Sequence, residues 1–181
     1  TGASRVDIVS HGTGVTLARE WVRQDVSRKL VRRFVAIDGP NNGMVICSAA
    51  SDNPWALVFT GGFTPRSPLC QELGSPDTPF LKLLNKAGAR IDPKDTLVIR
   101  NSIVSFAFMP QPDNLTGGVG TPVVDSYNLP ADFSESPRIK RAAEDVVIDG
   151  QGAHDLTAGT AHVGIFNSPI TWQKLVGFLT R

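Results

Sequence analysis

Short apolar blocks alternate with amphipathic stretches along the 181 residues of this chain. Two blocks rich in β-branched residues, Arg5–Ser10 and Arg33–Asp38, predict buried strands. The stretch between them, Val15–Ser27, repeats its apolar positions at helical spacing and predicts a helix. The apolar side of this helix is expected to hold Val15, Leu17, Ala18, Trp21 and Val22. A strand, a helix and a strand in this order indicate a parallel sheet with right-handed crossovers.

The rest of the chain predicts further elements of the same kinds. Thr96–Arg100 and Asp145–Asp149 have the pattern of buried strands, and Thr78–Ala87 predicts a short amphipathic helix. Either Thr78 or Asp77 can cap that helix, because both side chains accept hydrogen bonds from the first turn. Three segments show little periodicity and are expected to be irregular: Asn41–Glu72, Met109–Ser136 and Gly150–Gly164.

A final helix is predicted after Ser168, which acts as its cap, with Pro169 in the first turn. Its inward face is expected to consist of Trp172, Leu175, Val176 and Leu179. The predicted fold class is therefore α/β, a mostly parallel sheet flanked by helices, in a single domain over residues 1–181.

The first predicted strand begins almost at residue 1, and apart from Asp7 both its faces are apolar. A parallel strand that is buried on both faces normally lies inside a sheet. We therefore expect its neighbours upstream of Thr1, either on a separate N-terminal chain of the same protein or lost. The opening at Thr1 instead of a methionine also indicates a processed or cut N-terminus.

Composition excludes several classes of partner. Hydrophobic residues make up 41% of the chain and charged residues 19%, which is ordinary for a globular domain that buries a core. The net charge of +1 gives no electrostatic reason to expect a nucleic acid or an acidic membrane surface. No apolar run reaches the length of a membrane span.

The two cysteines, Cys47 and Cys70, enclose a segment rich in serine, proline and glycine. They are either two unrelated buried thiols or a disulfide. We expect a disulfide, because a loop this irregular needs a tether, and closing it would stabilise the fold by about 3 kcal/mol. A disulfide would imply an oxidising compartment.

The segment Val6–Gly14 reads V-D-I-V-S-H-G-T-G. A strand, a sharp turn of small residues and a helix form the layout of a nucleophile elbow, whose usual core is G-x-S-x-G. The middle position of that core is Gly12, which has no side chain to attack a carbonyl. Glycine tolerates the strained backbone of such a turn, so the fold survives the change. The alternative is a glycine-rich turn with no catalytic history.

Four motifs in the same order give the chain a resemblance to a known family. They are the elbow above, R-F-V-A-I-D-G-P-N-N-G (33–43), S-P-L-C-Q-E-L-G-S-P-D-T-P-F-L-K-L-L-N (67–85) and G-T-A-H-V-G-I (159–165). Together they resemble secreted bacterial and fungal lipases and extracellular polyester depolymerases of the α/β-hydrolase fold. The resemblance covers the second half of that fold. It implies a domain that lacks the family's usual N-terminal strands.

The resemblance also implies roles for individual residues. Gly12 takes the nucleophile position, and His162 takes the place of the catalytic base on the loop before the last helix. The backbone N–H of Thr13 is the expected oxyanion donor. His154 lies outside the matching motif, and His11 is expected to pack beside the turn without a chemical role.

The third member of the expected triad is a carboxylate. The position usual in these lipases follows the strand Thr96–Arg100, where this chain offers Ser105 or Phe108 instead. Asp38, at the end of the strand after the elbow, is the expected acid, because a carboxylate there can hold the tautomer of His162. Asp38 can alternatively cap the Gly39-Pro40 turn. Asp113 and Asp125 are more distant candidates.

These features leave three functional classes open. The first is an ester hydrolase of the Ser-Asp-His type that is inactive because Gly12 replaces its serine, and the second is a pseudoenzyme that binds apolar ligands. The third, an N-terminal-nucleophile hydrolase acting through Thr1, has only that residue in its favour. A metal site built from His11, His154 and His162 is disfavoured because their spacings match no ligand motif, so neither a metal nor a cofactor is expected.

The expected substrate is an apolar ester or polyester, and the expected location is extracellular. Two of the irregular segments are candidate lids over the site. These lids are Cys47–Cys70 and Met109–Ser136, and the expected apolar lining consists of Trp55, Phe59, Phe63, Phe106 and Phe108. These aromatic side chains line an apolar crevice in this interpretation, although the last two fit a core position better.

Overall fold

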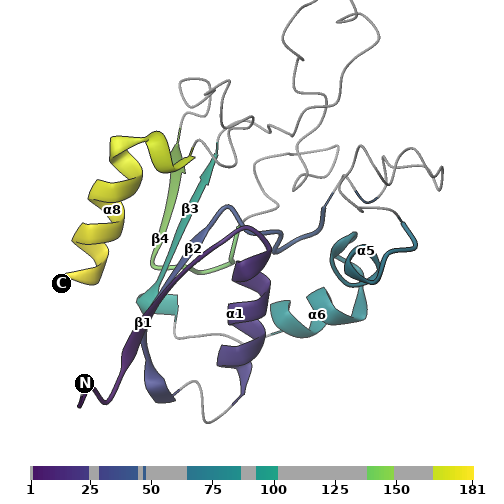
Figure 1. Ribbon diagram of the computed structural model, residues 1–181, viewed down its shortest axis with the longest axis horizontal. Coiled ribbons are helices and arrows are strands. Elements are labelled where there is room, and N and C mark those ends of the chain that lie inside the picture. Colours follow the sequence, from purple (N-terminus) through teal and green to yellow (C-terminus); the bar gives the residue numbers. More distant parts are fainter. Residues whose placement is uncertain are drawn as a thin grey trace, which may run out of the picture.

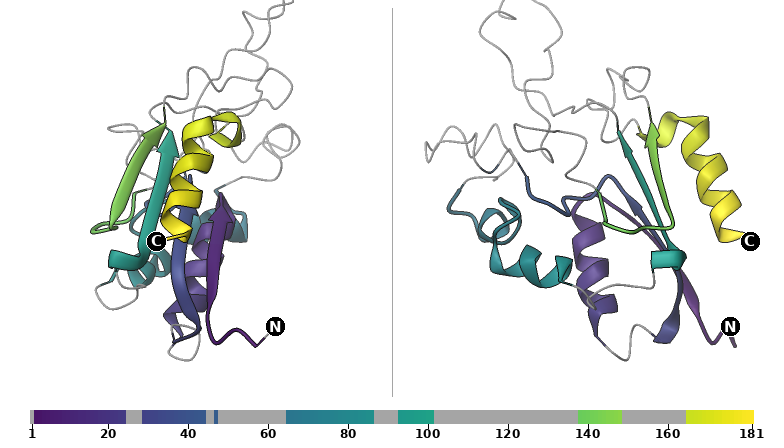
Figure 2. Two further views of the ribbon diagram at one scale, coloured as in Figure 1. Left: turned by 90° about the vertical axis from the view of Figure 1, so that its left-hand side faces the viewer. Right: turned by 180° about the vertical axis from the view of Figure 1, so that it is seen from behind.

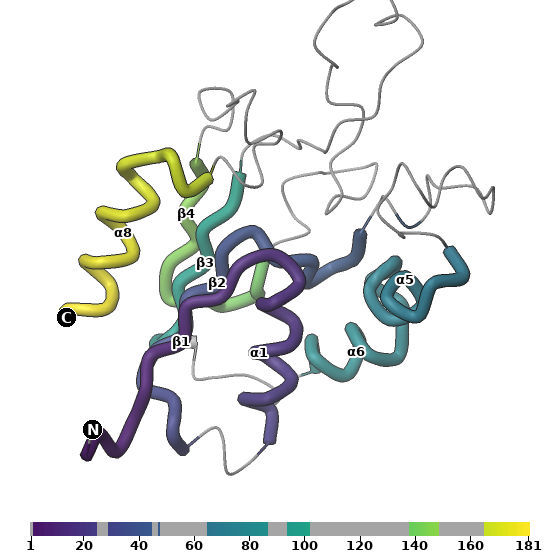
Figure 3. Tube along the Cα trace, viewed as in Figure 1, coloured from purple at the N-terminus to yellow at the C-terminus, as the bar shows by residue number. Residues whose placement is uncertain are grey.

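The computed structural model describes residues 2–24, 29–44, 47, 65–86, 93–101, 138–148 and 165–181. Within this part of the chain, a four-stranded parallel sheet has the strand order β1-β2-β3-β4. The strands are β1 (Val6–His11), β2 (Val31–Ile37), β3 (Thr96–Asn101) and β4 (Glu144–Ile148). The chain adds each strand on the same side of the last, as Figure 1 and the trace in Figure 3 show.

Helices cover both faces of the sheet, which confirms the predicted α/β class. Helix α1 (Thr13–Arg23) connects β1 to β2, and α6 (Pro79–Asn85) packs beside it. Helix α8 (Pro169–Leu179) lies on the opposite face, as the right-hand view of Figure 2 shows. Two short 3-10 turns lead into their following elements: η1 (Pro93–Asp95) into β3 and η4 (Ile165–Asn167) into α8.

The period-two pattern of the strands divides the core into two layers. On β2, Phe34 and Ala36 pack toward α1, while Val35 and Ile37 pack toward α8. Strand β3 is buried along its whole length, which is what a parallel strand between two helical layers requires. The positions of β2 and β3 could be predicted from the sequence, because burial on both faces selects continuous apolar runs.

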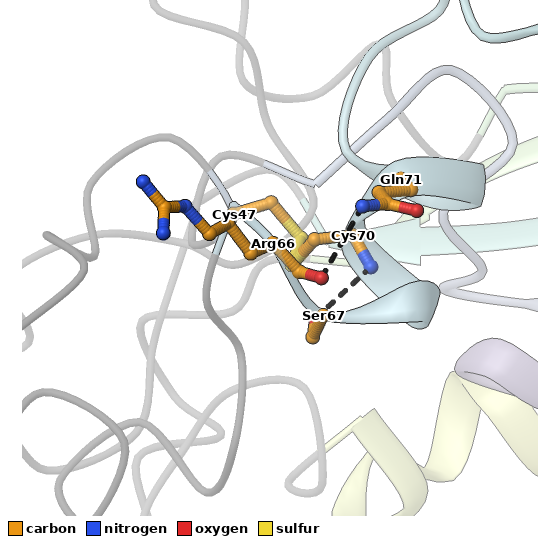
Figure 4. Close-up of a disulfide and its surroundings, with 5 residues drawn as sticks. All are labelled: Cys47, Arg66, Ser67, Cys70 and Gln71. Atoms are coloured by element: carbon orange, nitrogen blue, oxygen red, sulfur yellow. Dashed lines mark hydrogen bonds between the residues drawn. A yellow bond between two sulfur atoms is a disulfide. The ribbon is translucent and has the colours of Figure 1, made fainter. Parts of the chain in front are cut away.

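A disulfide joins Cys47 to Cys70, as predicted, with 5.3 Å between their Cα atoms. It anchors a separate small core against the short helix α5 (Pro68–Leu73), seen in Figure 4. Ser67 caps α5 by accepting a hydrogen bond from the Cys70 N–H at 3.2 Å. The prediction that residues up to Glu72 are irregular was therefore wrong here, because a six-residue helix is too short to show periodicity.

The predicted inward faces of two helices were partly wrong. On α1, Leu17 is 69% exposed, and Trp21 is also exposed, whereas the charged Arg19 is buried. On α8, Trp172 is 50% exposed, and Val176 is exposed beside it. Apolar residues encircle more of each helix than the sheet covers. The predicted cap Thr78 is confirmed, because its side chain accepts a hydrogen bond from the Leu81 N–H of α6 at 3.3 Å. Ser168 precedes α8 but makes no side-chain cap bond.

Strand β1 forms an edge of the sheet within the described ranges. Its residues are exposed or half-buried along its whole length, and Val9 is 47% exposed. The expectation that further strands upstream of Thr1 cover β1 stays a prediction.

Candidate active site

Gly12, Asp38 and Asn101 follow or end three neighbouring strands at the carboxyl edge of the sheet. The register pairs His11 at the end of β1 with Ile37 at the end of β2. Hydrogen bonds continue the ladder past both strands: the Gly12 N–H donates to the Ile37 carbonyl at 3.0 Å, and the Asp38 N–H donates to the Ile99 carbonyl at 2.8 Å. Gly12 and Asp38 therefore leave adjacent strands at the same edge, where ligands bind in open α/β sheets.

The predicted strand–turn–helix unit at Gly12 is confirmed. Gly12 has φ 56° and ψ −137°, a backbone conformation that residues with a side chain rarely adopt. The Val15 N–H donates to the Gly12 carbonyl at 3.0 Å, so α1 starts without an intervening loop. A strand, a residue with positive φ and an immediate helix start together match the layout of a nucleophile elbow.

Thr13 is the first residue of α1 and is half-buried. The N–H groups of a first helical turn have no acceptor inside the helix, and the helix dipole makes this end partially positive. The first turn of α1 contains no acidic residue that would cancel this charge. The first turn of α1 therefore places partial positive charge next to residue 12.

Asp38 is only 3% exposed and has φ 46°, in the left-handed region that aspartate tolerates better than most residues. The Asn101 side chain, itself buried at the end of β3, donates through Nδ2 to Asp38 Oδ2 at 3.2 Å. The sequence reasoning missed Asn101. Its one signal was a polar residue at the end of β3, at the same sheet edge as Asp38.

Gly39 allows the turn after β2 to lie against α1. A Cβ added to Gly39 would come within 2.8 Å of three side-chain atoms of Val15. The Asn41 N–H then donates to the Gly39 carbonyl at 2.8 Å, which closes a tight turn. Only a glycine therefore fits between Asp38 and Pro40. The close packing of Gly39 on Val15 fixes the position of Asp38 relative to α1.

Aromatic side chains adjoin the elbow on the α8 side of the sheet. The half-buried His11 ring packs edge-on against Phe166, with 4.8 Å between ring centroids. Phe166 in turn lies 6.1 Å from the Trp172 ring, and Trp172 Nε1 donates to the Phe166 carbonyl at 2.7 Å. His11 thus packs against η4, and the exposed Trp172 extends this aromatic surface.

Several sequence candidates lie outside the described residues. They are His162 and His154, the alternative acids Asp113 and Asp125, the positions Ser105 and Phe108, and the aromatic residues Trp55, Phe59, Phe63 and Phe106. Among the residues that the structure does describe, no three histidine, cysteine or acidic side chains gather as metal ligands would. Within the same ranges, no helix has the length and apolar character to span a bilayer.

Comparison with protein families gives one finding. The family described as Lipase (class 2) matches residues 1–102, which is more than half of the 181-residue chain. The matched span includes the elbow, Asp38, the disulfide and β3 with Asn101. Neither the curated proteins nor the solved structures gave a match.

Proposed function

The chain belongs to the class 2 lipase family, and we propose that it is a carboxylic ester hydrolase of the Ser-Asp-His type whose nucleophile position is occupied by Gly12. The backbone of Gly12 carries this proposal. Its φ of 56° and ψ of −137°, at the junction of β1 and α1, form a turn that a generic strand-to-helix connection does not need. The turn is retained although the residue in it has no side chain.

The remaining machinery is assigned to three groups. The N–H of Thr13 would stabilise the oxyanion of the tetrahedral intermediate, since it belongs to the residue after the nucleophile. His162 would act as the general base. Asp38 would accept the second ring N–H of His162 and fix its tautomer. In this proposal the bond from Asn101 to Asp38 holds the carboxylate in place for that role.

An apolar ester is the proposed substrate class. The edge-on contact of His11 with Phe166, and the half-exposed Trp172 beyond it, place aromatic surface next to the elbow. Apolar surface around a few convergent polar groups favours acyl chains or polyesters over charged substrates. The disulfide between Cys47 and Cys70 supports secretion, because such bonds persist in oxidising compartments.

Restoring the nucleophile tests the proposal. The chain as it stands is expected to show no turnover of a short-chain p-nitrophenyl ester, whereas Gly12→Ser is expected to show turnover. In the Gly12→Ser background, His162→Ala is expected to reduce kcat by about a thousandfold or more. His154→Ala in the same background is the matched control, because it removes the other histidine of that region and should leave kcat unchanged.

The outcomes separate the proposed function from its rivals. Turnover that survives His162→Ala would overturn the assigned base, and turnover that survives Asp38→Asn would overturn the assigned acid. A folded Gly12→Ser protein that lacks turnover but binds a non-hydrolysable apolar ester analogue would indicate a pseudoenzyme that serves as a binding module. A folded variant with neither turnover nor binding would refute the ester-hydrolase proposal.

A further inference from the structure

Three aromatic side chains form a strip that begins beside the elbow. The ring of His11, the residue before Gly12, packs edge-on against Phe166 with 4.8 Å between ring centroids, and Phe166 lies 6.1 Å from the Trp172 ring. Both distances are typical of aromatic rings in contact. Figure 1 shows the start of α8, which carries Trp172 in its first turn, near the tips of β3 and β4. We call His11, Phe166 and Trp172 the aromatic strip.

The last ring of the aromatic strip is fixed in position although its surface is open. Trp172 is 50% exposed, and its Nε1 donates to the Phe166 carbonyl at 2.7 Å. The neighbouring Thr171 is fully buried, and its Oγ1 donates to the Ile165 carbonyl at 2.6 Å. These two bonds fasten η4 to the first turn of α8. Aromatic surface that is already held in place loses little conformational entropy when a ligand covers it.

Trp21 provides a comparison within the described residues. It is 41% exposed on α1, at a distance of nine residues, or roughly 13 Å, from Gly12. A single exposed apolar side chain of this kind is ordinary and needs no ligand to explain it. Trp172 differs because it continues a row of rings that starts next to the elbow. Contiguous apolar surface beside a few polar groups is typical of a ligand-binding groove.

From this arrangement we propose that Trp172 binds the apolar chain of the ester substrate and sets the chain length that the site prefers. The inference rests on the function proposed above, because it takes residue 12 as the position at which the ester reacts. A short alkyl chain at this position would reach only His11 and Phe166. A longer chain would also cover Trp172. The chain can belong to the acyl half or to the alcohol half of the ester, since both present the same CH₂ groups.

The expected effect of Trp172 depends on chain length. A fully buried CH₂ group strengthens binding by about fourfold, and contact with one side of a ring gives less. Loss of the contact with two or three such groups therefore predicts about tenfold weaker binding of a long chain. A chain too short to reach Trp172 should bind almost equally well without it.

The chain with Gly12 allows binding to be measured without turnover, because no nucleophile is expected at residue 12. Isotope-labelled protein is titrated with methyl octanoate and with methyl butyrate and followed by NMR, with the indole N–H signal of Trp172 identified by its loss in Trp172→Phe. We expect methyl octanoate to shift this signal and to bind more tightly than methyl butyrate. Trp172→Ala is expected to weaken octanoate binding about tenfold and to change butyrate binding by less than about twofold.

Two variants control for general effects of the substitution. Trp21→Ala removes a tryptophan of similar exposure from α1 and should leave both affinities unchanged. Trp172→Phe keeps an aromatic ring without the bond to the Phe166 carbonyl, so it should retain more octanoate affinity than Trp172→Ala. Urea unfolding without ligand checks that each variant is folded. Octyl acetate and butyl acetate form a parallel series, and a preference for the longer chain in one series only identifies which half of the ester lies on the aromatic strip.

Equal weakening of octanoate and butyrate binding by Trp172→Ala would overturn the inference, as would an equal effect of Trp21→Ala. Octanoate binding that leaves the Trp172 indole signal unmoved would also overturn it. Turnover by Gly12→Ser with no chain-length effect of Trp172→Ala would leave the ester hydrolase standing and refute the role of Trp172. Binding that depends on chain length and on Trp172, in a chain whose Gly12→Ser variant has no turnover, would support that role and refute the proposed hydrolysis.

Discussion

The backbone strain at Gly12 can be measured by adding a single methyl group. Gly12 has φ 56°, so a side chain at this position must adopt a conformation that costs about 1–3 kcal/mol. Gly14, two residues later in the first turn of α1, has room for a Cβ, which would meet no atom within 4 Å. Gly12→Ala and Gly14→Ala are therefore a matched pair.

The two substitutions share an effect on the entropy of the unfolded chain, and they differ in backbone strain. Replacing glycine by alanine restricts the unfolded chain at either position, which stabilises the folded state by about 0.4–1 kcal/mol. That gain cancels in the comparison, and the strain at residue 12 remains. Gly12→Ala is thus expected to be less stable than Gly14→Ala by about 1–3 kcal/mol, which in a protein of this size corresponds to roughly 2–12 °C in Tm.

Urea and thermal unfolding of the two variants measure the difference directly, and circular dichroism at low temperature shows whether both are folded. Equal stability of the variants would refute the reasoning, because an unstrained residue 12 cannot form the elbow. A loss confined to Gly12→Ala would show that the turn imposes the same cost on any nucleophile placed there, including the serine of Gly12→Ser.

Three further perturbations follow from the packing and the charges. Gly39→Ala places a Cβ within 2.8 Å of Val15 atoms and is expected to cost about 1–3 kcal/mol in urea unfolding; a Val15→Ala change in the same protein should recover part of the loss if the clash is the cause. Hydrogen bonding to Arg32 holds the pKa of Asp7 below its ordinary value, so the pair stabilises the folded state above about pH 3.9 and loses its effect as the pH falls. The gap in urea midpoint between the parent and Asp7→Asn should therefore shrink between pH 6 and pH 3 (roughly the span around that pKa), and a constant gap would contradict the assignment. Cys70→Ser should lower the free energy of unfolding by about 3 kcal/mol, and a reductant should bring the parent down by the same amount but leave the variant unchanged.

The sequence predicted the parts of the fold in which burial is unambiguous. The strands β2 and β3 lie between two helical layers, so their apolar runs could be read without knowledge of their neighbours. The Cys47–Cys70 bond was also predictable, because an irregular segment between two cysteines leaves few other ways to order it. In each case one physical requirement dominates the choice of residues.

Helix faces were less predictable because they depend on partners distant in sequence. Arg19 is buried on α1 while Leu17 is exposed, the reverse of what their polarity suggests. The burial of Arg19 depends on oxygens supplied by Leu84 and Asn85, 65 and 66 residues away along the chain. The sequence pattern of α1 alone therefore cannot predict the burial of Arg19.

The candidate site shows why a glycine at the proposed nucleophile position need not disturb the fold. Gly12, Asp38 and Asn101 follow or end three adjacent strands, and their backbone positions are set by ladder bonds such as Gly12 N–H to the Ile37 carbonyl at 3.0 Å. None of these backbone bonds uses a side chain at residue 12. A serine there would contribute chemistry but no packing, and its strained backbone would cost stability. Selection on stability alone therefore favours glycine at this position, and only selection on activity would favour a serine there.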